Sequence, residues 1–543
     1  MHRSIIGSVA ALAAALMFAT APAVNAGVSE FPPDHEGYHT YAEIDAELSD
    51  VVATYGQGAG AIVKRFVIGK SGEGRDIWAL KISDRVASDE AEPEVLAEAN
   101  MHAREHITVE MALYMIHLLT DNYGGTDDLG QRVTRIVDTR EIWVIPTVNP
   151  DGAEWDIKDS KFHKWRKDRF DNPNSDCMGI DINRNFGFMW GLKGSSAKPC
   201  AGGYRGQFPF QSVEARVLRD FMLSRRIGGR QQIKAVFNWH SYGEFVMWPY
   251  GYTKEDIPPT MTVDDHEAFV ALARRMASLN GYKAHQGSDS YIYSGDFPAW
   301  AYGDQRTFVF TLEMYPPWGC TGCGGFYPPD TVITRETTRN RETVLYLLDQ
   351  ADCPYRSAGL AQTNCGPLYD NFEVANGWSV DPFGTDGADD GRWERGVPEA
   401  TSDVNGAKQL GNVTSGQADF STGRTAGASV DANDVDGGTT SLRSPQFKLG
   451  SGAWQLTFSY TFGHDAAADA SDFLRVSVIS GGVRTVVWSA VGDGANSNAA
   501  WTGAAVSLSP WNGKNVRLLF EAADGGADNL VEAAVDDVRV YKP

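Results

Sequence analysis

Two polar residues that could share one metal ion stand directly after an apolar, strand-like segment. His102 and Glu105 lie three positions apart in the run His-Ala-Arg-Glu-His. In a tight turn, residues with this spacing can point the same way and offer an imidazole and a carboxylate to one Zn2+ ion. Alone, the pattern is weak, because a histidine on a surface turn is usually only solvated.

Two other expected strands also run into polar residues, one into His240 and the other into Glu313. Ligand sites in open α/β sheets lie beyond the carboxyl ends of the strands, so we expect all four side chains to meet there. His102, Glu105 and His240 would hold zinc and leave one position open for water. Glu313 would be costly to bury unless a charge lies near it, which favours a place beside the metal.

The elements that must position these residues alternate between about residues 38 and 349. Apolar strand-like runs alternate with helical patterns, which predicts an α/β fold with a mixed sheet flanked by helices on both faces. The hairpin connection of the first two strands is expected at Ser71-Gly72-Glu73-Gly74. The strands are expected at 61–68, 77–82, 94–98, 142–148, 233–238 and 307–312, and the helices at 109–122, 212–224, 266–279 and 334–351.

The character of the chain changes after residue 352. Cys-Pro, Ser-Ala-Gly and Asn-Cys-Gly-Pro follow, as is typical of a linker. Beyond it, short alternating segments are separated by Gly, Asp, Asn and Ser clusters, which predicts an all-β sandwich or jelly-roll domain. We therefore expect four parts: an export signal at 1–26, a catalytic domain at 27–352, a linker at 353–367 and an accessory β-domain at 368–543.

The N-terminus has the pattern of an export signal. Arg3 precedes an apolar stretch from Ile5 to about Ala19, and small residues prepare cleavage near Ala26. A membrane span needs about 20 apolar residues, and no later segment supplies one, so we expect no membrane insertion. The expected location is outside the cytoplasm, either extracellular or periplasmic.

Six cysteines in an exported chain indicate disulfide bonds. Cys320 and Cys323 could instead form half of a zinc ribbon, but the chain has no second Cys-x-x-Cys to complete it. Grouping along the chain favours three local bridges: Cys177 with Cys200, Cys320 with Cys323, and Cys353 with Cys365.

The formal charge of −22 argues against nucleic acid as a partner, because phosphates would be repelled and no long basic run overrides that charge. Clustered carboxylates at 431–437 and near Asp536 and Asp537 make Ca2+ a second candidate cation, beside the plain reading of a solvated acidic surface. We expect a monomer.

Several motifs in a consistent order resemble the zinc metallocarboxypeptidase family, which includes pancreatic carboxypeptidases A and B and bacterial carboxypeptidase T. The resemblance covers roughly residues 36–350. It is carried by the His-Ala-Arg-Glu-His turn, Pro146 to Gly152, Trp165-Arg166-Lys167, Asp181 to Asn185, His240-Ser241-Tyr242, Tyr291 with Trp300, and Phe310 to Glu313.

The resemblance implies a hydrolase that removes the last residue of peptides or proteins, with one zinc ion bound. It implies that Glu313 is the general acid/base and that Arg166, assisted by Arg104, stabilises the oxyanion. Asp181 would accept a hydrogen bond from His102 and orient it. The residues implied in substrate binding are Arg104, Asn183, Arg184, Tyr242, Tyr291, Asp289 and Asp296.

The resemblance also bears on specificity. The planar fork of Arg184 suits the terminal carboxylate of a peptide, which predicts terminal cleavage. Asp289 is placed like an acidic pocket residue of the bacterial relatives, and Pro298 stands where basic-specific members carry Asp and apolar-specific members Ile. We therefore expect broad specificity for apolar and basic terminal residues.

Three alternatives compete with this interpretation. In an inverted zinc motif, His102 and His106 would bind the metal with Glu105 as base, which leaves His240 and Glu313 without roles. An inactive binding module is disfavoured by the intact set of ligands and base. A deacylase of small amides is disfavoured by the expected carboxylate clamp.

Overall fold

The computed structural model describes residues 31–90, 92–173, 175–227, 230–373 and 375–542. The expected export signal at 1–26 lies outside these ranges. Within them, every helix is too short or too polar to span a membrane.

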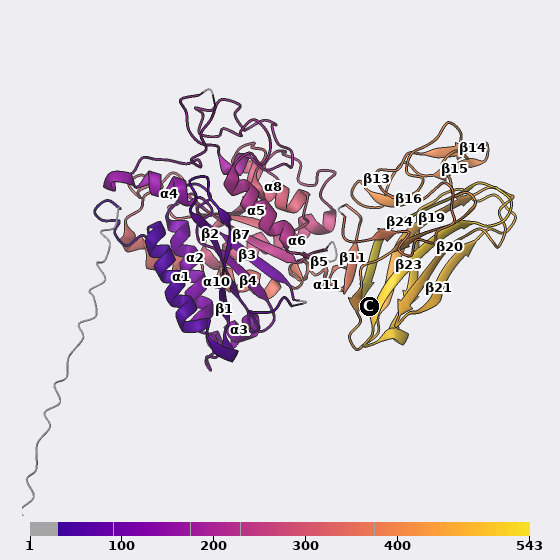
Figure 1. Cartoon of the computed structure of the whole chain (residues 1–543), viewed down its shortest axis with the longest axis horizontal. Coiled ribbons are helices and arrows are strands. Elements are labelled where there is room, and N and C mark those ends of the chain that lie inside the picture. Colours follow the sequence, from indigo (N-terminus) through magenta and orange to yellow (C-terminus); the bar gives the residue numbers. More distant parts are fainter. Residues whose placement is uncertain (1–30, 91, 174, 228–229, 374, 543) are drawn as a thin grey trace, which may run out of the picture.

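The N-terminal part is built around an eight-stranded mixed sheet (Figure 1) in the order β1-β2-β4-β3-β7-β10-β8-β9. β4, β3, β7 and β10 run parallel, while β1 and β2 form the expected antiparallel hairpin and β8 runs antiparallel to β10. The strands are β1 (Val63–Lys70), β2 (Asp76–Ile82), β3 (Glu94–Glu98), β4 (Glu141–Ile145), β7 (Ile233–Ser241), β8 (Phe245–Trp248), β9 (Lys283–Gln286) and β10 (Phe308–Met314). β5 (Arg226–Ile227) pairs antiparallel with β6 (Arg230–Gln231) in a separate two-stranded sheet.

Helices cover both faces of this sheet, which confirms the predicted fold class. One hydrophobic core contains side chains of α1, α2, α3, α6 and α10, and the core on the other face contains α5 and part of α8. The helices are α1 (Tyr41–Tyr55), α2 (Ile107–Thr120), α3 (Asp128–Val137), α4 (Pro150–Asp156), α5 (Val213–Ser224), α6 (Val263–Asn280), α7 (Gly287–Ser290), α8 (Phe297–Gly303), α9 (Ile333–Arg339) and α10 (Arg341–Gln350).

Two expected elements differ from the structure. The single helix expected at 334–351 is interrupted at Asn340, which has φ −87° and ψ −2°. The Asn340 amide donates to the Glu336 carbonyl and the Tyr282 hydroxyl, and such side-chain bonds compete with a continuous helix. The strand expected at 142–148 ends at Ile145, because Pro146 lacks the N–H that the ladder would need.

The C-terminal part contains two six-stranded antiparallel sheets packed face to face, which confirms the predicted β-sandwich. Apolar side chains of β19, β20, β23 and β24 fill the space between them. The first sheet contains β11 (Leu368–Asp370), β13 (Trp393–Gly396), β16 (Asp419–Thr422), β19 (Gln455–His464), β22 (Thr502–Ser507) and β24 (Val531–Tyr541). The second contains β12 (Ser379–Val380), β17 (Gly438–Arg443), β18 (Phe447–Lys448), β20 (Phe473–Ser480), β21 (Val483–Val491) and β23 (Asn515–Asp524), and β14 (Thr401–Asp403) pairs with β15 (Gly406–Gln409).

The segment between the two parts is compact rather than extended. It forms a 3-10 helix at Pro354–Ala358 and α11 (Ala361–Asn364), closed by the Cys353–Cys365 disulfide. The other two expected bridges, Cys177–Cys200 and Cys320–Cys323, are also formed. Arg306 forms an ion pair with Glu373 at 3.3 Å, which joins the two parts of the chain.

Candidate active site

The sheet places two of the candidate residues side by side. β7 and β10 are neighbouring parallel strands, and Glu313 is the register partner of His240. Paired residues of parallel strands direct their side chains to the same face of a sheet. His240 and Glu313 therefore share one surface at the carboxyl ends of their strands.

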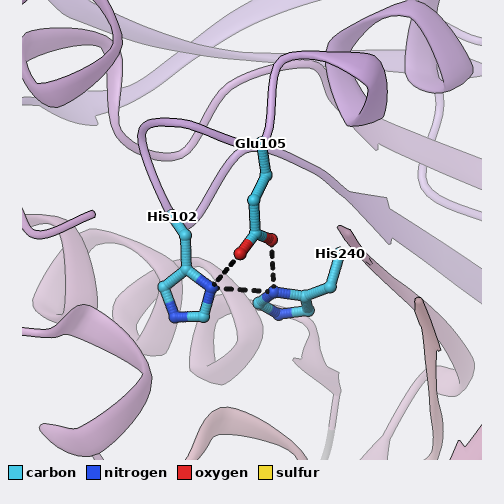
Figure 2. Close-up of side chains that lie close together, drawn as sticks. All are labelled: His102, Glu105 and His240. Carbon is cyan, nitrogen blue, oxygen red and sulfur yellow. Dashed lines mark hydrogen bonds and ion pairs between the residues drawn. The ribbon is translucent and has the colours of Figure 1, made fainter. Parts of the chain in front are cut away.

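His102, Glu105 and His240 converge on one point (Figure 2). Nδ1 of His102 lies 2.9 Å from Oε1 of Glu105, and Nδ1 of His240 lies 2.9 Å from Oε2 of the same carboxylate. The two Nδ1 atoms are 3.0 Å apart. All three residues are buried, so their polar atoms face one another rather than solvent.

Local backbone bonds hold this arrangement. The Glu105 N–H donates to the His102 carbonyl at 3.0 Å, which closes the turn after β3. The Ser241 N–H donates to Oε2 of Glu105 at 3.0 Å, which ties the carboxylate to the end of β7. Burial alone would raise the pKa of Glu105, but the adjacent imidazoles His102 and His240 lower it below its ordinary value.

A buried carboxylate stands behind His102. Nε2 of His102 lies 3.3 Å from Oδ1 of Asp181, within ion-pair distance but without the alignment of a hydrogen bond. Arg166 donates from Nε to Oδ2 of Asp181 at 3.0 Å. Asp181 therefore lies where it was expected, on the ring nitrogen that faces away from Glu105.

The donor set fits a zinc ion. Two imidazole Nδ1 atoms and a carboxylate oxygen lie within 4.8 Å of one another, and zinc is held by such nitrogen and oxygen ligands. Burial, reinforced by the Arg166 charge, lowers the pKa of His102 and so favours the neutral imidazole that a metal requires.

His106 is not directed at this cluster. Its Nε2 lies 3.0 Å from Oδ2 of Asp156, and its ring packs edge-on against Phe31. The geometry therefore opposes the inverted motif, in which His102 and His106 would share the metal.

A cavity of about 680 Å³ opens beside the cluster and contains most of the expected site residues. Burial, followed by the charge of Glu105, raises the pKa of half-buried Glu313 well above its ordinary value, with partial opposition from Arg166 and Arg184. The expected residues that line the cavity are His102, Arg104, Glu105, Arg166, Asn183, Arg184, His240, Tyr242, Asp289, Tyr291 and Glu313.

One wall of the cavity offers a buried guanidinium. Arg184 donates from Nη2 to the Tyr291 hydroxyl at 2.9 Å and from Nη1 to the Asn183 carbonyl at 2.5 Å. The Asn183 side chain is fixed by the Phe297 N–H, which donates to its Oδ1 at 2.8 Å. Arg184 is 5% exposed, whereas Tyr291 is 56% exposed and stands at the surface.

Asp296, which was expected among the substrate-binding residues, does not line the cavity. It caps α8, where its Oδ2 accepts from the Ala299 N–H at 3.1 Å, and it is 1% exposed. An Asp followed by Phe-Pro is a helix-start signal, and this structural use accounts for its burial. Asp289, in contrast, faces the cavity and lies 3.7 Å from Nζ of Lys254.

The sequence interpretation missed the aromatic rim. Trp318 is 72% exposed and stacks on Tyr242 with 5.9 Å between ring centroids. The Arg104 guanidinium lies 3.8 Å from the centroid of Phe326. The available signal was the aromatic and glycine-rich loop that follows the Glu313 strand directly and carries its own disulfide.

The carboxylates considered for calcium give no support to a second metal. Oδ2 of Asp536 accepts from the Thr414 N–H at 3.0 Å and hydroxyl at 2.6 Å, and Asp537 accepts from the Ser415 hydroxyl at 2.9 Å. Asp436 lies elsewhere on the β-sandwich, in a group with Asp524 and Asp528. Exposed acidic groups of this kind are common in proteins without a bound ion. We do not retain calcium.

Comparisons with known proteins point the same way as the geometry. The sequence signature of the family described as "Zinc carboxypeptidase" matches residues 49–343. A zinc carboxypeptidase of Saccharothrix mutabilis subsp. capreolus is 43% identical over 333 residues, covering 61% of this chain and 74% of that protein. Carboxypeptidase A1 of Rattus norvegicus is 31% identical over 315 residues, covering 58% and 70%. The crystal structure of thrombin activatable fibrinolysis inhibitor aligns with a TM-score of 0.51 at 25% identity, covering 58% and 74%.

Proposed function

Because this chain belongs to the zinc carboxypeptidase family, we propose that it is an exported enzyme that removes apolar and basic residues from peptide C-termini. The observation that carries this proposal is one cavity with three convergent metal donors on one side and the buried Arg184 guanidinium on the other. A metal group without the guanidinium would suit internal cleavage equally well.

His102, Glu105 and His240 are proposed to hold the zinc ion. When bound, zinc supplies a Lewis acid that polarises the scissile carbonyl and lowers the pKa of water. Glu313 accepts a proton from the attacking water on its carboxylate and returns it to the leaving amine.

Arg166 is proposed to stabilise the negative charge that develops on the carbonyl oxygen. Its Nε is committed to Asp181 at 3.0 Å, which fixes the side chain and directs the remaining N–H groups. A preorganised cation of this kind needs no rearrangement during the reaction. Arg104 lines the same cavity and assists.

Arg184 is proposed to bind the terminal carboxylate of the substrate. It lies in a low-dielectric wall and carries donors in a planar fork that matches a carboxylate. Asn183 flanks it, and the exposed Tyr291 can cover the bound end of the peptide. An amide or a continuing chain would leave the buried cation unpaired.

A mixed pocket wall supports the proposed broad side-chain preference. Met247 and Pro298 give apolar surface, while Asp289 gives a negative charge that Lys254 at 3.7 Å only partly offsets. Apolar residues gain from burial, and basic residues gain from the carboxylate.

Export and domain division form the remainder of the proposal. Three disulfides among the described residues are typical of chains that fold in an oxidising compartment. Residues 27–352 are proposed as the catalytic unit, 353–367 as the linker and 368–543 as an accessory β-domain of a monomer.

The test is cleavage of one peptide with a free and with an amidated C-terminus, with and without a chelator, with products identified by mass. We expect stepwise loss of terminal residues from the free peptide only, and loss of activity on zinc removal that added zinc restores. Equal cleavage of both peptides, or internal fragments, would reject the proposed function.

A further inference from the structure

A second cavity, of about 200 Å³, lies between the catalytic part and the β-sandwich, at the end of β7 opposite to the zinc ligand His240. Its walls come from the amino-terminal end of β7, the loop before β10, the linker and the segment that follows β11. Figure 1 shows β5, α11 and β11 together at this junction. Three cationic side chains line it: Arg230, Lys234 and Arg306.

Two of these three cations form no ion pair with a carboxylate in the described ranges. Among the described residues, no carboxylate lies within 4.0 Å of a nitrogen of Arg230 or Lys234, whereas Arg306 pairs with Glu373. Arg230 donates to the Pro367 carbonyl at 3.2 Å, and Lys234 donates to the Gln231 carbonyl at 2.5 Å. Neutral carbonyls satisfy donors but do not cancel charge.

The surroundings of Lys234 disfavour its charged form. Burial and then the neighbouring charge of Arg230 lower its pKa to about 8. Burial also lowers the pKa of Arg230, with partial opposition from the charge of Asp370. Two like charges share a poorly solvated space, in a chain that is strongly acidic as a whole.

The acids of the same cavity are already occupied by donors. Asp265 accepts from the hydroxyls of Tyr302 at 2.6 Å and Tyr355 at 2.5 Å. Asp352 pairs with Arg140 at 2.8 Å, and Asp370 accepts from the Trp378 indole N–H at 2.8 Å. The donors of the cations are therefore the groups that remain for a ligand.

Two further groups in the walls lack partners. Within the described part of the chain, the buried Nε of Arg306 has no hydrogen-bond acceptor, and the side-chain oxygen of Gln305, a residue 7% exposed, has no hydrogen-bond donor. The amide of Gln305 can be turned to present its N–H group to the cavity. A ligand with several acceptor oxygens would satisfy these positions together.

We propose that this junction cavity binds one small oxyanion, such as sulfate or inorganic phosphate, between Arg230, Lys234 and Arg306, and that the bound anion stabilises the packing of the two parts. Charged hydrogen bonds to such an anion would replace the repulsion between Arg230 and Lys234. The cavity is smaller than the roughly 300–1,000 Å³ of sites for drug-sized ligands, which favours a compact ion over a peptide. The proposal does not depend on the catalytic activity.

The experiment is calorimetric titration of the full-length, zinc-loaded protein with sulfate, then separately with phosphate, at constant ionic strength set with chloride. We expect saturable binding of one anion per chain. Binding should weaken by about ten-fold or more in Arg230→Gln and, separately, in Lys234→Gln, because each loses a charged donor. Lys448→Gln, an exposed change on β18, is the matched control and should bind as the wild type does.

Thermal unfolding gives a second readout. Sulfate stabilises most proteins weakly and without saturation, and this general effect should be equal in all variants. The specific effect should saturate in the wild type and in Lys448→Gln, and should be lost in the two cavity variants. Their midpoints without anion should equal or exceed that of the wild type, since one repelling charge is gone.

Absence of saturable binding to the wild type would overturn the proposal. So would unchanged binding in the Arg230 and Lys234 variants, because the anion would then lie elsewhere, for example beside Arg184. Saturation by phosphate but not sulfate would identify phosphate as the preferred oxyanion, and the reverse would identify sulfate.

Discussion

Arg184→Ala removes the buried guanidinium that we assign to the substrate carboxylate. The side chain is 5% exposed and is held by the Tyr291 hydroxyl at 2.9 Å and by the Asn183 carbonyl. Truncating one member of a buried, charge-assisted pair costs about 2 to 4 kcal/mol. That range corresponds to a loss of about 30- to 900-fold in kcat/KM for a peptide with a free C-terminus.

The assay compares kcat/KM for free and amidated forms of one peptide in wild type and variant. The amide removes the partner charge from the substrate side, so the four values form a double-mutant cycle. Arg184→Lys keeps the charge without the planar fork, so its kcat/KM for the free peptide should lie between the values of wild type and Arg184→Ala. Arg169→Ala is the control, because Arg169 stacks 3.9 Å from the Trp155 ring centroid and does not line the cavity.

The assignment of Arg184 would be refuted if the effects of the Arg184→Ala substitution and of the C-terminal amide on kcat/KM were additive in free energy. If Arg184→Ala lowers kcat/KM by the same factor for free and amidated peptides, the guanidinium does not recognise the terminal carboxylate. A fall in zinc content of Arg184→Ala would show instead that the substitution damages the metal group.

Three further outcomes test other parts of the site and the fold. Zinc content, measured by elemental analysis, should be lost when His102, Glu105 or His240 is replaced by Ala, and kept in His106→Ala; the reverse for His106 would revive the inverted motif. Glu313→Gln should retain zinc but lose about two or more orders of magnitude in turnover, and near-normal turnover would exclude it as the base. Glu98 is fully buried, and burial raises its pKa from 4.5 to about 8. Its contribution to stability is therefore fully present below pH 4.5, where the side chain is protonated in both states, and is lost as the pH rises through 8. Glu98→Gln should therefore raise the free energy of unfolding at pH 7 by about 2 to 3 kcal/mol and have little effect at pH 4.5; an equal effect at both pH values would contradict this.

Much of the catalytic sheet could be predicted because its strands are short apolar runs that end in polar residues. β3, β7 and β10 are parallel neighbours, so the polar residues at their carboxyl ends lie at the same edge of the sheet. His240 and Glu313 could therefore be placed together before their contacts were known. Asp296 shows the limit, because an acidic residue near a pocket and an acidic helix cap look alike in sequence.

Other features depend on contacts that no local pattern encodes. The break at Asn340 arises from side-chain bonds to the Glu336 carbonyl and to Tyr282, the latter 58 positions away. Arg230 and Lys234 appear in sequence as ordinary surface cations. In the structure both are half-buried and share a cavity with residues of the linker and β11.

The register of β7 and β10 links catalysis to the folding of the sheet. Because Glu313 is paired with His240, a slip of one residue between these strands would shift the carboxylate by about 3.3 Å and turn it to the opposite face. A molecule mispaired in this way could keep near-native secondary structure and still be inert. Specific activity per bound zinc should thus report the fraction of molecules with correctly aligned strands, a quantity that circular dichroism does not resolve.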